Sequence, residues 1–214
     1  MKIFLDTAVV EDINHRHHGL IDGVTTNPTL IAKSGRTPHE VYQEIFDLGI
    51  KDLSIEVQGV YFDELIAHGL SMIDTYGDRA TIKLPCTPDG LKACKYLVSR
   101  GIRVNMTLVF SVSQAILCSL AGATYVSPFV GRLDDNGHNG IELIREIARV
   151  FTIHRSETKI LAASLRSAQS AANSFAAGAH ICTVPCKVFD DMFKHVLTDK
   201  GFEQFLLDFG FSNE

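Results

Sequence analysis

The sequence has no tryptophan, no hydrophobic run long enough to cross a membrane and no excess of positive charge. A membrane-spanning helix needs about 18 consecutive apolar residues, and nucleic-acid binding needs clustered basic residues. Instead, 20 Lys and Arg face 25 Asp and Glu, a net charge of −5. We therefore expect no membrane and no nucleic-acid partner. Asp6 lies where a secretory signal would still be apolar, so we expect a cytoplasmic protein.

Cysteine and proline are scarce. The five cysteines form no CxxC pair and most lie in apolar segments, so we expect buried, reduced thiols rather than disulfides or a zinc site. The six prolines build no Pro-rich linker. A chain of 214 residues can bury roughly 70% of its unfolded surface, which is enough for a stable core without cross-links. We expect a single domain over 1–214.

Short apolar segments rich in β-branched residues alternate with longer segments of helical period. The expected strands are 3–5, 23–25, 53–57, 80–84, 103–109, 124–129, 159–163 and 180–184. The expected helices are 38–48, 63–75, 88–100, 113–121, 140–152, 168–177 and 187–195. Eight strand–helix units of about 27 residues each predict a (β/α)₈ TIM barrel with no inserted domain. A doubly wound open sheet is the alternative, although no GxGxxG follows the first strand.

Lys83 is the first candidate for chemistry, because it is a charged residue inside a strand. It alternates with Ile82 and Leu84, so it points into the barrel if that apolar pair packs on the helices. Burial disfavours the charged form of a lysine, and a neutral amine can form a Schiff base with a carbonyl. The alternative is a structural lysine that pairs with an interior carboxylate.

Two carboxylates belong near this lysine. Asp6 ends the first strand and Glu56 lies near the end of the third, at the barrel face that carries active sites. Both suit proton transfer. Asp6 could instead cap the next helix, and Glu56 could be a salt-bridge partner of Lys83.

Uncharged polar residues and two arginines are expected at the same face. Hydroxyl and amide groups there can hold sugar hydroxyls or a water, and arginine forks bind phosphate. The candidates are Thr25, Asn27, Asn105, Thr107, Ser127, Arg132, Ser164 and Arg166. Each polar residue could serve a turn instead, and either arginine could pair with Asp134, Asp135 or Glu142.

Three other features have less specific interpretations. The run 15–18 (His-Arg-His-His) could bind a metal, but a solvated helix end is the better interpretation. Asp134 and Asp135 fit the opening of a loop better than a cation site. A further helix over 200–209 carries Phe202, Phe205 and Phe209 on one stripe, so it either folds back on its own barrel or packs on a neighbouring subunit.

The pattern as a whole resembles the transaldolase family, in its short single-domain branch. The resemblance runs in family order along nearly the whole chain, through 4–8, 23–30, 82–85, 105–111, 121–132, 162–166 and 197–201. It departs from the family at Leu165 and in the segment 168–170, at the outer rim of the phosphate site.

The resemblance implies a role for each candidate. Lys83 would form the Schiff base, Asp6 would transfer the C4-hydroxyl proton, and Glu56 with Thr107 would hold the water of the imine steps. Hydroxyls of the dihydroxyacetone unit would bind Asn27 and Ser127, with Thr25 and Asn105 around them. Phosphate would bind Arg132, Ser164 and Arg166. The reaction needs no metal or organic cofactor, and the branch typically forms decamers built from pentameric rings.

A related enzyme, fructose-6-phosphate aldolase, cleaves the sugar rather than transferring the fragment. It has glutamine where this chain has Glu56 and tyrosine where this chain has Phe129. Phenylalanine offers the enamine no proton, which favours transfer to an acceptor aldehyde. We therefore expect a transaldolase of the pentose phosphate route, with the aldolase as the alternative. A non-catalytic phosphosugar-binding barrel with a structural Lys83–Glu56 pair remains open.

Overall fold

Eight parallel strands close into a barrel in the order in which they occur along the chain, in a computed structural model that describes residues 1–16 and 19–211. The strands are β1 (Lys2–Asp6), β2 (Gly23–Thr25), β3 (Leu53–Glu56), β4 (Ala80–Pro85), β5 (Val104–Val109), β6 (Tyr125–Pro128), β7 (Lys159–Ala162) and β8 (Ile181–Val184). β1 pairs with both β2 and β8, which closes the ring. The predicted (β/α)₈ barrel is therefore confirmed, and the doubly wound alternative is wrong.

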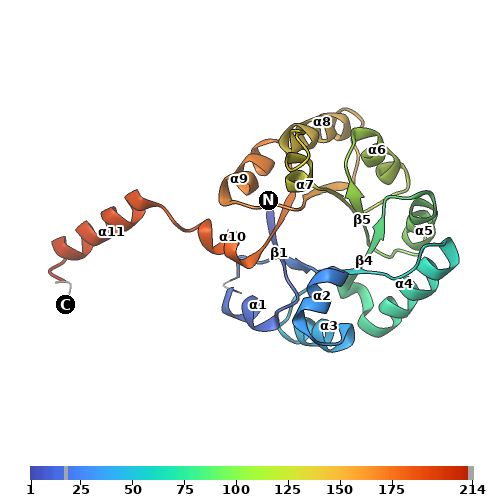
Figure 1. Cartoon of the computed structure of the whole chain (residues 1–214), viewed down its shortest axis with the longest axis horizontal. Helices are drawn as coiled ribbons and strands as arrows, with labels where there is room; N and C mark the ends of the chain where they lie inside the picture. The colour runs from blue at the N-terminus through green and yellow to red at the C-terminus, as the bar shows by residue number, and fades with distance from the viewer. Residues whose placement is uncertain (17–18, 212–214) are drawn as a thin grey trace.

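Helices surround the barrel and connect each strand to the next (Figure 1). They are α1 (Val10–Arg16), α2 (Pro28–Ser34), α3 (Pro38–Asp47), α4 (Phe62–Tyr76), α5 (Pro88–Val98), α6 (Val112–Leu120), α7 (Val130–Asp134), α8 (Gly140–Ile153), α9 (Ala168–Ala176), α10 (Cys186–Asp191) and α11 (Val196–Asp208), with a 3₁₀ turn η1 (Gly77–Arg79) before β4. The long, strongly periodic helices match the sequence prediction to within two residues at each end.

Local signals explain where the helices begin. Thr37 and Thr87 cap α3 and α5 with their side-chain oxygens, and a proline follows each cap at the first helical position. Ser111 and Ser167 cap α6 and α9 in the same way. Thr87 and Ser111 come shortly after β4 and β5, so α5 and α6 begin close to the carboxyl ends of these strands.

Two apolar cores lie on either side of the strands. The larger core lies between strands and helices and includes Ile82 and Leu84 of β4, both fully buried. The smaller core fills the barrel interior and contains Phe4, Tyr125, Leu161, Ala163 and Ile181. Phe4 meets Tyr125 edge to face, with ring centroids 6.2 Å apart. Alternate residues of each strand therefore face the interior, as the placement of Lys83 required.

Gly23 is needed for this interior packing. A Cβ atom at this position would lie 2.6 Å from the Phe4 ring and 2.6 Å from the Asp52 carbonyl oxygen. Only glycine lets β1 and β2 pair beside a phenylalanine that points into the barrel.

A charged network lies beneath that aromatic pair. Buried Asp52 accepts hydrogen bonds from Thr81 (2.7 Å), Arg103 (2.8 Å) and Tyr125 (2.7 Å). Burial and the nearby Asp52 carboxylate raise the pKa of Tyr125, so its hydroxyl remains a donor. The network joins β4 and β6 to the segments that precede β3 and β5, at the end of the barrel away from Lys83.

Several helix predictions needed correction. α1, α2 and α7 are short helices that were not predicted as elements, and the helix expected over 187–195 ends at Asp191. In the histidine run, Arg16 is the last residue of α1 and pairs with Asp12 and Asp190. His17 and His18 lie outside the described residues.

The last helix, α11, extends away from the barrel beyond α10 (Figure 1). It begins at Val196, four residues before the expected start, and none of its residues is buried. Phe202, Phe205 and Phe209 are 62%, 63% and 79% exposed. The helix does not fold back on its own barrel. Among residues 1–16 and 19–211, no helix combines the length and apolarity needed to cross a membrane.

Candidate active site

A cavity of about 140 Å³ lies inside the barrel, where the carboxyl ends of the strands meet. Its lining is predominantly polar and comes from seven of the eight strands or the residues that directly follow them. The lining residues are Asp6, Thr25, Asn27, Lys83, Asn105, Thr107, Ser127, Phe129, Arg132, Leu161, Ala163, Ser164 and Thr183. All the candidate residues from the sequence except Glu56 and Arg166 therefore share one cavity.

Lys83 lies on the inner face of β4 and is 6% exposed. Its Nζ donates a hydrogen bond to the Thr26 carbonyl oxygen at 3.1 Å, and it lies 3.1 Å from Oε2 of Glu56. Strand register brings the acid and the amine together, because Glu56 on β3 pairs directly with Lys83 on β4. The amine thus has a carboxylate beside it that can exchange a proton.

Asp6 enters the cavity from the end of β1. Its Oδ1 accepts a 2.8 Å hydrogen bond from the hydroxyl of Thr25, which also lies 2.6 Å from the hydroxyl of Thr183. Burial raises the pKa of Asp6, and this effect outweighs the opposing influence of Thr25 and Lys83. A carboxyl group with a raised pKa is suited to accept and return a proton. Asp6 therefore contacts the interior of the site rather than capping a helix.

Thr107 has an unusual position on β5. Its Oγ1 is buried and, among the described residues, is the side-chain polar atom left without a hydrogen-bond partner. The strand is irregular directly after it, since the register with β6 shifts between Met106 and Val109 and Leu108 has a φ of 59°. Such bulges redirect side chains near functional sites. The hydroxyl remains available to a ligand or a water in the cavity.

Amide and hydroxyl groups form a chain across the cavity floor. Asn105 donates from Nδ2 to Ser54 Oγ at 3.2 Å, and Ser127 donates to Asn105 Oδ1 at 2.7 Å. These bonds fix the orientation of the Asn105 amide. Asn27 lines the same cavity, but its Oδ1 accepts the Leu30 N–H and caps α2, so its amide nitrogen is the part free to bind a ligand.

Phe129, Arg132 and Ser164 line the outer part of the cavity. The Arg132 guanidinium lies over the Phe129 ring, 5.0 Å from its centroid. Ser164 has a φ of 60°, and its carbonyl oxygen accepts the Gly131 N–H at 3.1 Å. A Cβ atom at Gly131 would come within 2.2 Å of that carbonyl, so glycine permits the close approach of the two segments.

Arg166 differs from Arg132 and Ser164, the other two candidates for phosphate binding, in where its side chain lies. It follows β7 but does not line the cavity, and its guanidinium makes a two-pronged ion pair with Asp135. This is the surface pairing that the sequence offered as the alternative to phosphate binding. Asp134, the neighbouring acid, accepts the Gly140 N–H at 2.9 Å at the start of α8.

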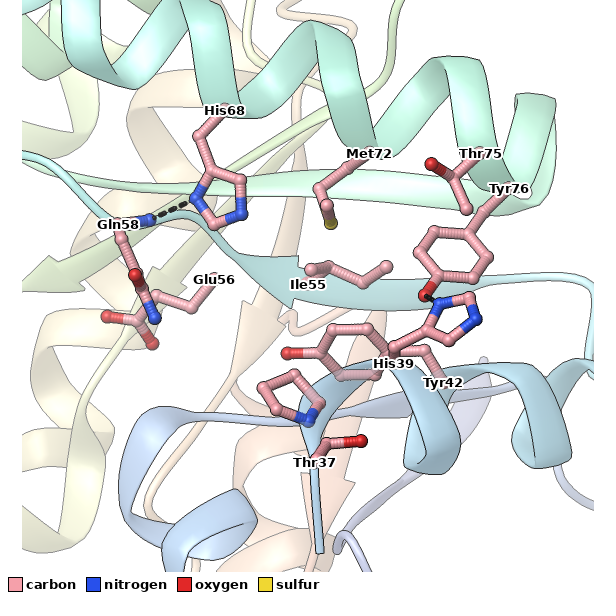
Figure 2. Close-up of a pocket in the computed structure, with 11 residues that line it drawn as sticks. Thr37, His39, Tyr42, Ile55, Glu56, Gln58, His68, Met72, Thr75 and Tyr76 are labelled. Atoms are coloured by element: carbon pink, nitrogen blue, oxygen red, sulfur yellow. Dashed lines mark hydrogen bonds between the residues drawn. The ribbon is translucent and has the colours of Figure 1, made fainter.

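A second cavity, of about 270 Å³, lies between α3 and α4 on the outer side of β3. Figure 2 shows Glu56, Gln58 and His68 toward one end of it, with His39 and Tyr76 toward the other. His68 Nδ1 accepts the Gln58 N–H at 2.7 Å, which leaves Nε2 as the protonated nitrogen of the neutral ring. Among the residues that the structure describes, no lysine or arginine lines this cavity. Glu56 therefore stands between Lys83 on one side and the second cavity on the other.

Three residues that line the cavity, and one that supports it, were not among the candidates from the sequence. Leu161, Ala163 and Thr183 line the cavity, and Ser54 holds Asn105. The alternation of side chains along a strand could have identified Thr183, because it shares a face of β8 with Ile181. It could also have identified Ser54, because Ser54 shares a face of β3 with Glu56. Within the described part of the chain, no group of three or more His, Cys, Asp or Glu side chains is arranged to hold a metal.

Comparison with known proteins gives a consistent result. Residues 3–205 match the family described as "Transaldolase/Fructose-6-phosphate aldolase". The chain is 49% identical to a "Probable transaldolase" of Geobacillus kaustophilus over 97% of its own length and 98% of that protein. It is 47% identical to one of Symbiobacterium thermophilum and 48% identical to one of Aquifex aeolicus, each over 97% of this chain and 96% of the relative.

Proposed function

Because the chain belongs to the transaldolase/fructose-6-phosphate aldolase family, we propose that it is a transaldolase that works through a Schiff base on Lys83. It transfers a dihydroxyacetone unit from a ketose phosphate, sedoheptulose 7-phosphate or fructose 6-phosphate, to glyceraldehyde 3-phosphate or erythrose 4-phosphate. The observation that carries the proposal is a buried amine that lines a polar cavity together with Asp6 and lies 3.1 Å from Glu56.

The reaction begins at Lys83. Its neutral amine adds to the C2 carbonyl of the donor, and the carbinolamine loses water to give a protonated imine. Glu56, 3.1 Å from the amine, exchanges protons with the water that leaves and later returns. The free hydroxyl of Thr107 helps to hold that water, and the second cavity beside Glu56 offers a route for solvent.

Carbon–carbon cleavage depends on Asp6. Its carboxylate takes the proton of the C4 hydroxyl, the C3–C4 bond breaks, and the electron pair forms an enamine with the lysine nitrogen. Erythrose 4-phosphate leaves when the donor is sedoheptulose 7-phosphate. The enamine carbon then attacks the aldehyde of glyceraldehyde 3-phosphate, Asp6 returns the proton, and water releases fructose 6-phosphate. The imine nitrogen is the electron sink, so the steps balance without a metal or organic cofactor.

The remaining lining residues bind and orient the substrate. Asn27 and Ser127 bind hydroxyls of the dihydroxyacetone unit, while Thr25 holds Asp6 in place and Asn105 holds Ser127. Arg132 and Ser164 bind the phosphate, and Arg166 joins them when it leaves Asp135. Phe129 brings no hydroxyl to the enamine, which supports transfer over release of free dihydroxyacetone.

A transfer assay tests the function. Wild-type protein with fructose 6-phosphate and erythrose 4-phosphate should form sedoheptulose 7-phosphate and glyceraldehyde 3-phosphate, and release of dihydroxyacetone without an acceptor should be slow. Fast release would identify the aldolase instead. Binding of sugar phosphates without turnover would identify a phosphosugar-binding barrel, and turnover retained by Lys83→Ala would exclude the Schiff-base mechanism.

We also propose that the protein self-associates through α11, as a pentamer or decamer in the cytoplasm. The helix extends from the barrel with its phenylalanine side chains exposed, and a second copy of the chain is the partner that the resemblance suggests. The variant Phe202→Asp/Phe205→Asp should lower the mass measured by light scattering, whereas Glu203→Gln should not. An unchanged mass for the double variant would contradict this assembly.

A further inference from the structure

The ion pair between Arg166 and Asp135 has a geometry that matters for the phosphate site. Nη1 of Arg166 donates to Oδ1 of Asp135 at 2.7 Å, and Nη2 donates to Oδ2 at 2.5 Å. The partners belong to different segments, since Asp135 directly follows α7 as its C-cap and Arg166 follows β7. Both side chains are about half exposed, at 49% and 58%. The pair can therefore open without disturbing the core.

The carboxylate uses the donors that a phosphate would use. An arginine fork presents two parallel N–H groups, and these fit two oxygens of either a carboxylate or a phosphate. One guanidinium edge cannot serve both anions in this way at once. Asp135 and a phosphate group therefore compete for Arg166.

The Arg166 side chain begins close to the cavity, although its guanidinium is bound to Asp135. Its Nε and Cγ atoms lie 3.0 and 3.2 Å from where a Cβ of Gly131 would be, so the side chain lies against the residue before Arg132. Arg132 and Ser164 already line the cavity. Rotation about the side-chain bonds of Arg166 can bring the guanidinium toward a phosphate held by those two residues.

We infer that Asp135 is a specificity-determining residue, which lowers the affinity of the site for phosphorylated substrates by competing for Arg166. This inference rests on the proposed function for the assignment of Arg132, Ser164 and Arg166 to the phosphate. A phosphate with a charge near −2 displaces the singly charged carboxylate, and Asp135 recaptures Arg166 when the phosphate leaves. A transferase must release one aldehyde phosphate before it takes up another. Competition from Asp135 shortens the residence time of each aldehyde phosphate in the site.

The size of the effect follows from the exposure of the pair. An exposed ion pair shifts an equilibrium by a factor of roughly 1.4 to 5. Apparent affinity falls in proportion to the fraction of Arg166 that is free of Asp135. The phosphate dissociation constant of wild-type protein should therefore be about two- to six-fold higher than that of a variant without the carboxylate.

Calorimetric titration with inorganic phosphate tests the inference without turnover. Asp135→Asn should lower the dissociation constant about two- to six-fold, and Asp135→Glu should stay near the wild-type value. Asp134→Asn is the matched control, because it removes the same charge one residue away and its amide oxygen can still accept the Gly140 N–H. In an Arg166→Gln background, Asp135→Asn should have no effect. With fructose 6-phosphate, Asp135→Asn should lower KM by a similar factor, while KM for unphosphorylated fructose should not change.

Several results would overturn the inference. They are an absence of phosphate binding to the wild type, equal effects of Asp135→Asn and Asp134→Asn, or an Asp135→Asn effect that persists without Arg166. The two proposals fail separately. If the titrations behave as expected but no transfer occurs, the proposed function fails and the competition stands; if transfer occurs and Asp135→Asn changes nothing, the competition alone is wrong.

Discussion

Glu56 and Lys83 are direct partners on neighbouring strands, and the carboxylate Oε2 lies 3.1 Å from the lysine Nζ. The same carboxylate borders the second cavity outside β3. A structural salt bridge would need only the contact between Glu56 and Lys83. A group that moves protons between the amine and solvent needs that contact and also the access to the second cavity. The two interpretations therefore predict different kinetics.

Replacing Glu56 should slow formation of the imine. Glu56→Ala should lower the rate at which the substrate adduct forms on Lys83 by about 100-fold, the typical contribution of a positioned acid–base group. Glu56→Gln should be affected less, because the amide can still hold a water. Rapid-quench trapping at fixed substrate concentration measures the rate. If both variants formed the adduct as fast as wild type, Glu56 would be only a structural partner.

Thr25 controls the pH at which Asp6 works. Burial already raises the pKa of Asp6, and the Thr25 hydrogen bond opposes that rise. Thr25→Val removes the bond, so the pKa rises further, and Asp6 must lose its proton at a higher pH to act as a base. The acidic limb of the kcat/KM profile should therefore move to higher pH. Thr183→Val is the control, since it leaves the Thr25–Asp6 bond intact. If the acidic limb of the Thr25→Val profile lay at the wild-type pH, Asp6 would not be the base.

Phe129 should govern the fate of the enamine. Phe129→Tyr places a hydroxyl in the cavity, which can protonate the enamine carbon and release dihydroxyacetone. The ratio of dihydroxyacetone released to fragment transferred should rise several-fold in a product assay with limiting acceptor. Phe110 packs against Phe129 with ring centroids 5.7 Å apart but does not line the cavity, so Phe110→Tyr should leave the ratio unchanged. Equal ratios in all three proteins would mean that Phe129 does not decide between transfer and release.

Asp52 should be important for stability rather than for catalysis. Asp52→Ala leaves Arg103, Thr81 and Tyr125 without their common acceptor, and breaking a buried charge pair costs about 3–5 kcal/mol of unfolding free energy. Urea denaturation measures the loss. Glu142→Ala breaks an exposed pair with Arg145 and should cost less than about 1 kcal/mol. Similar losses for the two variants would contradict the role assigned to the network.

Alternation along the strands predicted much of the fold and of the cavity. Lys83 could be placed in the interior because Ile82 and Leu84 need the apolar space between β4 and the helices, where the structure puts them. Asp6, Asn105 and Ser127 followed from the rule that strand ends meet at one face. Both inferences need only the alternation of side chains along a strand and the order of strands along the chain, and a sequence contains both.

Other features depend on distances that no sequence pattern encodes. The choice of Arg166 between Asp135 and the cavity depends on how α7 sits beside the loop after β7, and both pairings were chemically reasonable beforehand. The Asp52 network joins residues up to 73 positions apart. The helix α7 has only five residues, too few for a helical period to appear.

The most direct test of the account is the covalent intermediate itself. Wild-type protein incubated with fructose 6-phosphate and then reduced with borohydride should gain the mass of one dihydroxyacetone unit joined as a secondary amine, and peptide mass spectrometry should place it on Lys83. Lys83→Arg, which keeps the charge but not the nucleophile, should gain nothing. An unmodified wild-type Lys83, or an adduct that persists in Lys83→Arg, would contradict the mechanism proposed for this barrel.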